Sequence, residues 1–487
     1  MVEQTVITTE QTGWTLGTRL AFILGKLCIA LLQLAQWLRL PWGGTAFPGR
    51  VVLKIDRNIV ATLRRRYHGF ILVTGTNGKT STTAQLVQLL QSAGLEVVSN
   101  PEGANMVPGL VTALLKAEPI WPPAATPGYS GQTRLAVLEV DEGSLLPLSR
   151  RVTEVDMVII TNLFPDQLDR YGSVNALAKQ MKKALTAWRG ATLVLNADDP
   201  LVASFGQNRS HARYFAVETA DDDPAFISGE AGEVSLCPLC GQRLHYSSSR
   251  YAHLGCYACS GCDFSRPRPS VIAWLLPDKK EPGTLFLVRT PTEEVEFYSA
   301  LTGLYNVYNT TAALAATAVL QPKTKLASLT SAVAAFRAPA GRTEYFSWPD
   351  RSKEATLVLV KNPAGFNQAL TTLADTQTEG AATTLIIAIN DLPADGRDVS
   401  WLWDTYIDAI AGDVFVICSG RRARDVAVCF KYNGLPLDKM MVVPEVNKAV
   451  REALTAPAPN IIVLCNYTVL APLRQALVKQ GGKADAT

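Results

Sequence analysis

The segment from residue 70 to residue 93 constrains the fold of this chain more than any other stretch. Its first four residues are apolar and predict a short buried strand, and a helix is expected from Thr80 to about Ala93. Between them stands the run Gly75-Thr76-Asn77-Gly78-Lys79-Thr80. A strand, a glycine-rich loop and a helix in this order are typical of phosphate-binding α/β proteins. A sheet covered by helices is therefore the first expectation.

The glycine-rich loop has the features that nucleotide binding requires. Glycines allow a tight turn in which several backbone N–H groups point inward, and the helix that follows adds the positive end of its dipole. Lys79 is predicted to reach the β- and γ-phosphates of ATP, and the Thr80 hydroxyl to ligate Mg²⁺. Val73 stands where a full P-loop signature has its first glycine, so a glycine-rich turn without function is the alternative.

Three further apolar runs predict strands at 135–140, 157–161 and 192–196, and helical stretches such as Val174–Trp188 alternate with them. This alternation indicates a mostly parallel sheet. Each run ends in polar residues, namely Glu139, Asp141 and Glu142, then Asn162, Asp166 and Asp169, then Asn196, Asp198 and Asp199. Carboxylates at the carboxyl ends of parallel strands face the ligand crevice and can hold a metal, although each run alone is a weak signal.

Two Cys-x2-Cys pairs predict a structural zinc site in an insertion over about residues 229–269. Cys237 and Cys240 form the first pair and Cys259 and Cys262 the second, with eighteen residues between them. This spacing is typical of zinc ribbons in which four cysteines hold the ion tetrahedrally and leave no open position for catalysis. Cys256 breaks the spacing but remains an alternative ligand.

Zinc ribbons often bind nucleic acid, but the insertion is not notably basic and the whole chain carries a formal net charge of only +3. A nucleic-acid partner is therefore not expected. Tyr246, Tyr251, Tyr257 and Phe264 are expected to form a miniature core of the ribbon.

The apolar stretch Leu20–Leu40 admits two interpretations. Lys26, Gln33, Gln36 and Arg39 interrupt it, whereas a membrane span needs about 20 apolar residues. No small-residue cleavage site follows, which argues against a cleaved signal peptide. An amphipathic helix packed on the protein is favoured, and a helix lying on the inner face of the membrane stays open. Cysteines scattered singly outside the insertion fit a cytoplasmic protein.

The length of 487 residues, 48% of them hydrophobic, predicts two or three domains with sizeable cores. An N-terminal helical segment is expected over residues 1–49, and a central ATP-binding domain over 50–340. A new alternation of strands and helices follows Gly341, with strands expected at 356–360, 384–390, 414–419, 440–443 and 461–466. It predicts a C-terminal Rossmann-like α/β domain over 341–487.

The four histidines of the chain stand beside no plausible nucleophile. A self-contained Cys-His or Ser-His active site is therefore not expected. Chemistry that needs such a site must come from a partner.

These motifs resemble those of the Mur ligase family, the ATP-dependent amide ligases of cell-wall precursor synthesis. The resemblance covers most of the chain through 73–80, Glu139, 162–169, 196–200, 305–309 and 341–342. A narrower similarity, to MurT-type synthetase subunits of lipid II isoglutaminyl synthase, rests on 44–49, the cysteine-rich insertion, 361–365 and 390–401. Only about seventy residues precede the loop, so the domain that reads a UDP-linked substrate has no counterpart, which fits a lipid-linked substrate.

The resemblance implies a reaction and roles for named residues. The reaction is ATP-dependent amidation of the D-glutamate α-carboxylate of lipid II to D-isoglutamine through an acyl phosphate. Lys79 and Thr80 are implied on the phosphates and Mg²⁺, Glu139 toward the metal, Asn309 at the adenine and Arg342 at the nucleotide. Ammonia is expected from glutamine, hydrolysed by a GatD-type amidotransferase subunit in a heterodimer.

The resemblance further implies that this chain lends an aspartate to the glutaminase site of its partner. The matching position is Asp398, with Asp395 as the second choice. Such a carboxylate orients and stabilises the histidine of a catalytic triad. The alternative is that Asp391, Asp395 and Asp398 are ordinary turn and cap residues before a helix at Trp401.

The chain departs from the usual Mur ligase pattern in two ways. Gln167 stands where these ligases carry a histidine, and none of Lys179, Lys182 and Lys183 has clearly matching spacing for their carbamylated lysine. Two other functions therefore stay open at this point. One is a self-sufficient ligase of the Mur or folylpolyglutamate type, and the other is a non-catalytic zinc-ribbon binding protein.

Overall fold

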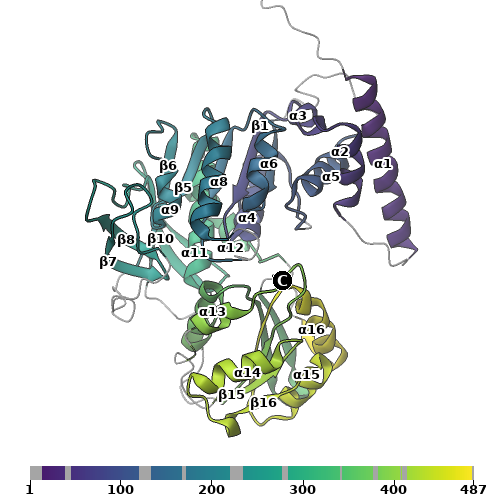
Figure 1. The fold of residues 1–487 in the computed structure, drawn as a ribbon, viewed down its shortest axis with the longest axis vertical. Helices are drawn as coiled ribbons and strands as arrows, with labels where there is room; N and C mark the ends of the chain where they lie inside the picture. Colours follow the sequence, from purple (N-terminus) through teal and green to yellow (C-terminus); the bar gives the residue numbers. More distant parts are fainter. Residues whose placement is uncertain are drawn as a thin grey trace, which may run out of the picture.

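The computed structural model describes residues 14–38, 45–101, 103–119, 133–166, 172–219, 234–276, 283–339, 343–376, 382–405, 407 and 414–484. Two α/β bodies follow a helical N-terminal segment along the chain (Figure 1). The predicted domain boundary at Gly341 and the candidate nucleotide contact Arg342 lie outside the described residues.

Three helices precede the central sheet, namely α1 (Leu16–Trp37), α2 (Phe47–Ile55) and α3 (Ile59–Arg64). This helical N-terminal segment therefore continues past its predicted end at residue 49. On one side α1 packs against α2 and α5 (Val107–Ala117) and buries Phe22 and Ile29. Its other side is exposed. Among the described residues, Leu16–Ala35 is the one stretch long and apolar enough to cross a membrane, a property it shares with many core helices. The predicted packed helix is thus present, and it also carries an uncovered apolar face.

The central body contains a nine-stranded sheet in the order β11-β10-β9-β6-β5-β4-β1-β3-β2. All neighbours from β2 to β9 pair in parallel, and β10 and β11 add an antiparallel edge. The strands are β1 (Gly69–Thr74), β2 (Glu96–Val98), β3 (Arg134–Glu139), β4 (Met157–Ile160), β5 (Thr192–Asn196), β6 (Ala212–Glu218), β9 (Val271–Leu275), β10 (Thr284–Arg289) and β11 (Glu294–Ser299). Of the strands that precede the predicted polar runs, β3 and β4 flank β1 directly and β5 lies next to β4.

Helices cover both faces of this sheet. Because side chains alternate along a strand, β1 sends Phe70 and Leu72 into one core and Ile71 and Val73 into the other. The first core includes residues of α5, α6 and α8, and the second includes residues of α4, α11 and α12. The helical elements are α4 (Lys79–Ser92), η1 (Glu142–Ser144), α6 (Leu145–Ser149), α8 (Val174–Ala187), α9 (Pro200–Ser204), α11 (Leu304–Leu320), η2 (Leu326–Leu329) and α12 (Thr330–Ala335).

The cysteine-rich insertion forms the antiparallel hairpin of β7 (Leu244–Tyr251) and β8 (Leu254–Cys259). It stands between β6 and β9, which are parallel neighbours in the sheet. The insertion therefore lengthens a crossover and leaves the order of the sheet intact.

The C-terminal body has a seven-stranded sheet in the order β16-β15-β14-β17-β13-β12-β18, parallel from β16 to β13. Its strands are β12 (Thr343–Trp348), β13 (Lys353–Leu359), β14 (Thr383–Ala388), β15 (Val414–Ser419), β16 (Met440–Val442), β17 (Asn460–Cys465) and β18 (Lys483–Ala484). Its helical elements are η3 (Pro349–Arg351), α13 (Pro363–Thr376), η4 (Ser400–Asp404), α14 (Ala423–Tyr432), η6 (Leu437–Lys439), α15 (Val446–Thr455) and α16 (Tyr467–Lys479). The five predicted strands are present, and the antiparallel strands β12 and β18, beyond β13, are additional.

Candidate functional site

The glycine-rich loop between β1 and α4 is shaped by two backbone positions that require glycine. Gly75 and Gly78 have φ angles of +127° and +83°, which other residues rarely adopt. A Cβ atom on Gly75 would lie 2.2 Å from Thr161 Oγ1, and one on Gly78 would lie 2.0 Å from Asn309 Oδ1. Gly78 also precedes α4 without a side chain to cap it, so the first N–H groups of the helix remain suited to an anion.

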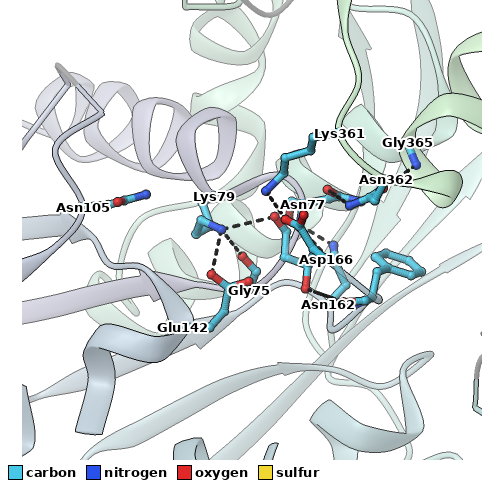
Figure 2. Close-up of polar contacts among 12 residues, drawn as sticks. Gly75, Asn77, Lys79, Asn105, Glu142, Asn162, Asp166, Lys361, Asn362 and Gly365 are labelled. Atoms are coloured by element: carbon cyan, nitrogen blue, oxygen red, sulfur yellow. Dashed lines mark hydrogen bonds and ion pairs between the residues drawn. The ribbon is translucent and has the colours of Figure 1, made fainter. Parts of the chain in front are cut away.

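Lys79 is buried at the start of α4, with its ammonium turned back over the loop. Its Nζ donates to the carbonyls of Gly75 (2.5 Å) and Thr76 (3.2 Å) and pairs with Glu142 Oε2 at 2.9 Å (Figure 2). Burial works against the charged form, but the carboxylates of Glu142, Asp141 and Glu139 outweigh it and raise the pKa of Lys79. The lysine is therefore held in its charged form beside the loop.

Two carboxylates, one at the end of β3 and one just after it, stand at this loop. Glu139 is buried at the end of the strand, and its Oε1 accepts from Asn105 Nδ2 at 3.0 Å. Glu142 follows in η1; burial would raise its pKa, but Lys79 and then Lys361 outweigh that effect and lower it. The set of Thr80, Glu139 and Glu142 offers the oxygen ligands that Mg²⁺ prefers. The sequence predicted Glu142 among the polar residues at this strand end. It did not predict the pairing of Glu142 with Lys79, which depends on the tertiary fold.

The polar residues after β4 brace the glycine-rich loop. Asn162 Oδ1 accepts from Asn77 N at 2.8 Å, and its Nδ2 donates to Asn77 O at 3.1 Å. Thr76 Oγ1 accepts from Phe164 N and donates to Phe164 O at 3.0 and 3.2 Å. These contacts fix the loop conformation from the neighbouring strand end.

The loop opens into a cavity of about 540 Å³ that both bodies line. Predicted site residues in its wall are Thr76, Asn77, Gly78, Lys79, Thr80, Glu139 and Asn309. Asn309, buried in α11, also accepts from Thr82 Oγ1 at 3.4 Å. The size lies in the ordinary range of small-molecule sites.

The C-terminal body contributes two polar side chains to the loop region. Lys361 Nζ lies 2.7 Å from Asp166 Oδ2, and Asn362 and Asn77 exchange amide hydrogen bonds of 3.0 and 3.3 Å (Figure 2). The sequence pattern singled out 361–365 without giving these residues a role. Their partners are 195 and 285 residues away, a separation that no local pattern bridges.

Asp398 does not line this cavity. It is exposed before η4, and its Oδ1 accepts from Ser400 N at 2.8 Å. This bond and the Ser400 side chain hold the pKa of Asp398 below its usual range. Asp395, the second choice, uses both oxygens on Thr468 at the start of α16. Asp398 is therefore the more accessible of the two.

The four predicted zinc cysteines lie together. Their sulfur atoms are all within 4.8 Å of one another, with 3.7 Å between Cys237 and Cys262 and 3.4 Å between Cys240 and Cys259. Ligands about 2.3 Å from a tetrahedral zinc lie about 3.8 Å apart, so the set fits the ion. Cys256 lies outside the set, 3.7 Å from the guanidinium of Arg250.

The hairpin of the insertion reaches the cavity, where Tyr251 and Leu254 line its wall. Tyr246, Tyr257 and Phe264 pack together as expected, but the prediction that Tyr251 joins this small core is wrong. Tyr251 packs on Phe164 instead, with ring centroids 5.2 Å apart, because the hairpin end is turned into the central body.

Two buried aspartates after β5 attach this hairpin to the sheet. Asp198 accepts from Arg266 Nε (2.6 Å), from Tyr308 OH (2.8 Å) and from Val217 N (3.0 Å). Asp199 lies 3.3 Å from Nε2 of His253 in the hairpin turn, accepts from Leu163 N at 2.7 Å and caps α9. Neither aspartate lines the cavity. The polar run after β5 therefore holds the insertion in place and does not face the cavity, unlike the runs after β3 and β4.

Comparisons with known proteins agree with this architecture. Residues 73–247 match the Mur ligase middle domain, and residues 359–470 match the MurT ligase C-terminal domain. A pseudomurein peptide ligase type C from Methanothermus fervidus has a similar structure, with TM-score 0.66 and 23% identity over 88% of this chain and 84% of that one. MurF ligase from Thermotoga maritima, solved in complex with ADP, also has a similar structure, with TM-score 0.59 and 13% identity. The match covers 89% of this chain and 85% of that one.

Sequence similarity also extends over a whole subunit. The chain is 31% identical over 441 residues to the MurT subunit of lipid II isoglutaminyl synthase (glutamine-hydrolyzing) from Streptococcus pneumoniae strain R6, covering 90% of this chain and 93% of that one. A span of this length takes in most of both bodies. The chain belongs to the MurT subunits of lipid II isoglutaminyl synthase, within the Mur ligase fold family.

Proposed function

We propose that this chain is the synthetase subunit that amidates the D-glutamate α-carboxylate of lipid II, using ATP and ammonia, in peptidoglycan synthesis. The observation that carries the proposal is one cavity lined by both bodies of a MurT-type subunit, with the glycine-rich loop in its wall. A loop that cradles phosphates and a second body facing it suit transfer of a phosphoryl group to a bound acid.

The loop residues are assigned to the triphosphate. Backbone N–H groups at Gly75–Lys79 and the start of α4 bind phosphate oxygens, and Lys79 moves from the loop carbonyls onto the β- and γ-phosphates. Thr80 and Glu139 would hold Mg²⁺, which would neutralise negative charge on the phosphates. Asn309, which touches the loop at Gly78, is assigned to the adenine side, as is Arg342 outside the described residues.

The reaction has two balanced steps. A carboxylate oxygen attacks the γ-phosphorus of ATP, and the bond between this phosphorus and the bridging oxygen breaks. The products are an acyl phosphate and ADP. Ammonia then attacks the carbonyl carbon, a proton leaves the nitrogen, and inorganic phosphate departs.

The ammonia comes from a GatD-type glutaminase subunit, and Asp398 completes the triad of that partner. Its exposure and its lowered pKa support this role, because an anionic carboxylate is needed to stabilise a protonated histidine. The resulting complex is a heterodimer.

The cluster of four cysteines holds structural zinc. Cys237, Cys240, Cys259 and Cys262 would supply all four ligands, so the ion would stabilise the ribbon rather than take part in catalysis.

The exposed side of α1 is assigned to the inner face of the membrane, where a lipid-linked substrate is reached. Leu16, Leu20, Leu27, Leu31 and Leu34 recur at helical spacing and are between 52% and 85% exposed. The helix α1 contains no acidic residue, which suits a surface of anionic lipids.

Mass analysis of lipid II tests the proposal directly. Lipid II is incubated with the chain, its partner subunit, ATP and glutamine, and in a second arm with the chain, ATP and ammonium chloride. Conversion of one carboxylic acid to an amide is expected in both arms, and omission of ATP should abolish it. Turnover with an amino acid and no ammonia source would instead identify a self-sufficient ligase.

A further inference from the structure

Lys361 has a position that the proposed role of the glycine-rich loop does not explain. It follows β13 in the C-terminal body, yet its ammonium faces the central body and contacts Asp166 after the end of β4 (Figure 2). Its side chain is 31% exposed and that of Asp166 is 12% exposed. The ion pair therefore lies at the cavity wall and is open to a ligand.

The backbone beside Lys361 is firmly held. Asn362 is 1% exposed, and its Oδ1 accepts from Gly365 N at 2.8 Å at the start of α13. The same side chain bonds to Asn77 in the glycine-rich loop. The ammonium of Lys361 is thus carried by a long side chain on a firmly held backbone. The next residue, Asn362, contacts the phosphate-binding loop.

The charges of the cavity wall indicate what this cation does. Four carboxylates line the cavity, namely Glu139, Asp141, Glu142 and Asp166. Against them stand Lys79, Lys361 and the exposed Arg337, whose guanidinium donates to backbone carbonyls of its own segment. Lys361 is the one charged residue that the described C-terminal body contributes to the wall.

The lysines of α8 do not supply a further group at the cavity. Lys179, Lys182 and Lys183 are all exposed, and none of them lines it. Lys79 approaches a triphosphate from the loop side. A second cation from the opposite body is what a phosphoryl group needs as negative charge spreads over its equatorial oxygens.

We propose that Lys361 is a catalytic residue whose ammonium leaves Asp166 and binds the phosphoryl group that passes from ATP to the carboxylate. This inference rests on the proposed function. Lys361 neither gives nor takes a proton: the bond to the bridging oxygen of ADP breaks, the bond to the carboxylate oxygen forms, and the lysine stabilises the charge between them. Asp166 keeps the ammonium at the cavity until the nucleotide arrives.

The test compares Lys361→Met and Lys361→Gln with Lys361→Arg in the complete complex, with ammonium chloride as nitrogen donor. Loss of the cation should lower kcat for lipid II amidation by about 100-fold, the usual effect of removing one transition-state contact. Affinity for Mg-ADP should be unchanged, because ADP lacks the transferred group. Lys361→Arg should retain more activity than either neutral variant.

Two controls separate the possible failures. Lys448→Met removes an exposed lysine of α15 and should behave as wild type. A wild-type complex that does not amidate lipid II would refute the proposed function itself. A wild-type kcat in Lys361→Met would overturn the catalytic role of Lys361. So would a loss of both Mg-ADP affinity and melting temperature in Lys361→Met and Lys361→Gln alike, because that result indicates a structural role.

Discussion

Arg266 of the cysteine-rich insertion forms an ion pair with the fully buried Asp198, which follows β5 of the central sheet, with 2.6 Å between Nε and Oδ1. Burial raises the pKa of Asp198, and the nearby guanidinium groups of Arg266 and Arg250 offset this only in part. The carboxylate also binds Tyr308, the neighbour of Asn309 in α11. The insertion is therefore joined to the body that holds the glycine-rich loop.

Arg266→Gln should destabilise the protein by about 3–5 kcal/mol, because it leaves a buried carboxylate short of its partner. Denaturant unfolding measures the loss. Arg243→Gln, an exposed arginine of the same insertion, should change the free energy of unfolding by less than about 0.5 kcal/mol. Restored stability on combining Arg266→Gln with Asp198→Asn would show coupling of the pair, and simple additivity would contradict it.

Cys259→Ser should lower zinc content and melting temperature, because structural zinc contributes to folding. Elemental analysis of the purified complex gives the zinc stoichiometry. Cys256→Ser is the matched control, since this sulfur lies outside the cluster, and it should keep the zinc. Full zinc in Cys259→Ser, or loss of zinc in Cys256→Ser, would require a different ligand set.

Lys79→Ala should abolish amidation while leaving the complex with the glutaminase assembled. It also leaves Glu142 buried without its partner, which by itself costs about 3–5 kcal/mol. The double variant Lys79→Met with Glu142→Gln removes this unpaired charge. It should therefore fold better than Lys79→Ala and still bind Mg-ATP poorly in a calorimetric titration. Wild-type affinity in the double variant would rule out a phosphate role for Lys79.

Asp398→Asn should cripple amidation from glutamine and spare amidation from ammonium chloride. In the proposed role, this carboxylate serves only the glutaminase of the partner, which free ammonia bypasses. Asp395→Asn should instead weaken the start of α16, where both oxygens of Asp395 bind Thr468, and lower the melting temperature. Parallel loss of both nitrogen sources in Asp398→Asn would refute the triad assignment.

Replacing Leu20, Leu27 and Leu31 together by Gln should weaken binding to vesicles that contain anionic lipid by at least about tenfold. Vesicle sedimentation without lipid II measures this independently of catalysis. The melting temperature should stay unchanged, because these side chains are exposed. Leu437→Gln, at an exposed leucine of the C-terminal body, is the control. If the wild-type protein does not bind vesicles, α1 has no membrane role. A protein partner would then be the candidate that covers the exposed apolar side of α1.

Local patterns in the sequence determined much of this protein. The succession of apolar runs and polar ends predicted the central strands, the start of α4 to within one residue and the five parallel strands of the C-terminal body. The Cys-x2-Cys spacing predicted which four sulfurs meet. These predictions succeed because strand burial, the need for glycine at positive φ and metal-ligand spacing all act over short distances along the chain.

Only the tertiary structure decided which groups meet across the chain. The contact of Lys361 with Asp166, the contact of Tyr251 with Phe164 and the pair of Arg266 with Asp198 each join residues that no periodicity relates. The turn of the ribbon hairpin into the body moved Tyr251 from its expected core to the cavity wall. Such contacts depend on how two sheets and an insertion pack together, which the spacing of residues within any one segment does not specify.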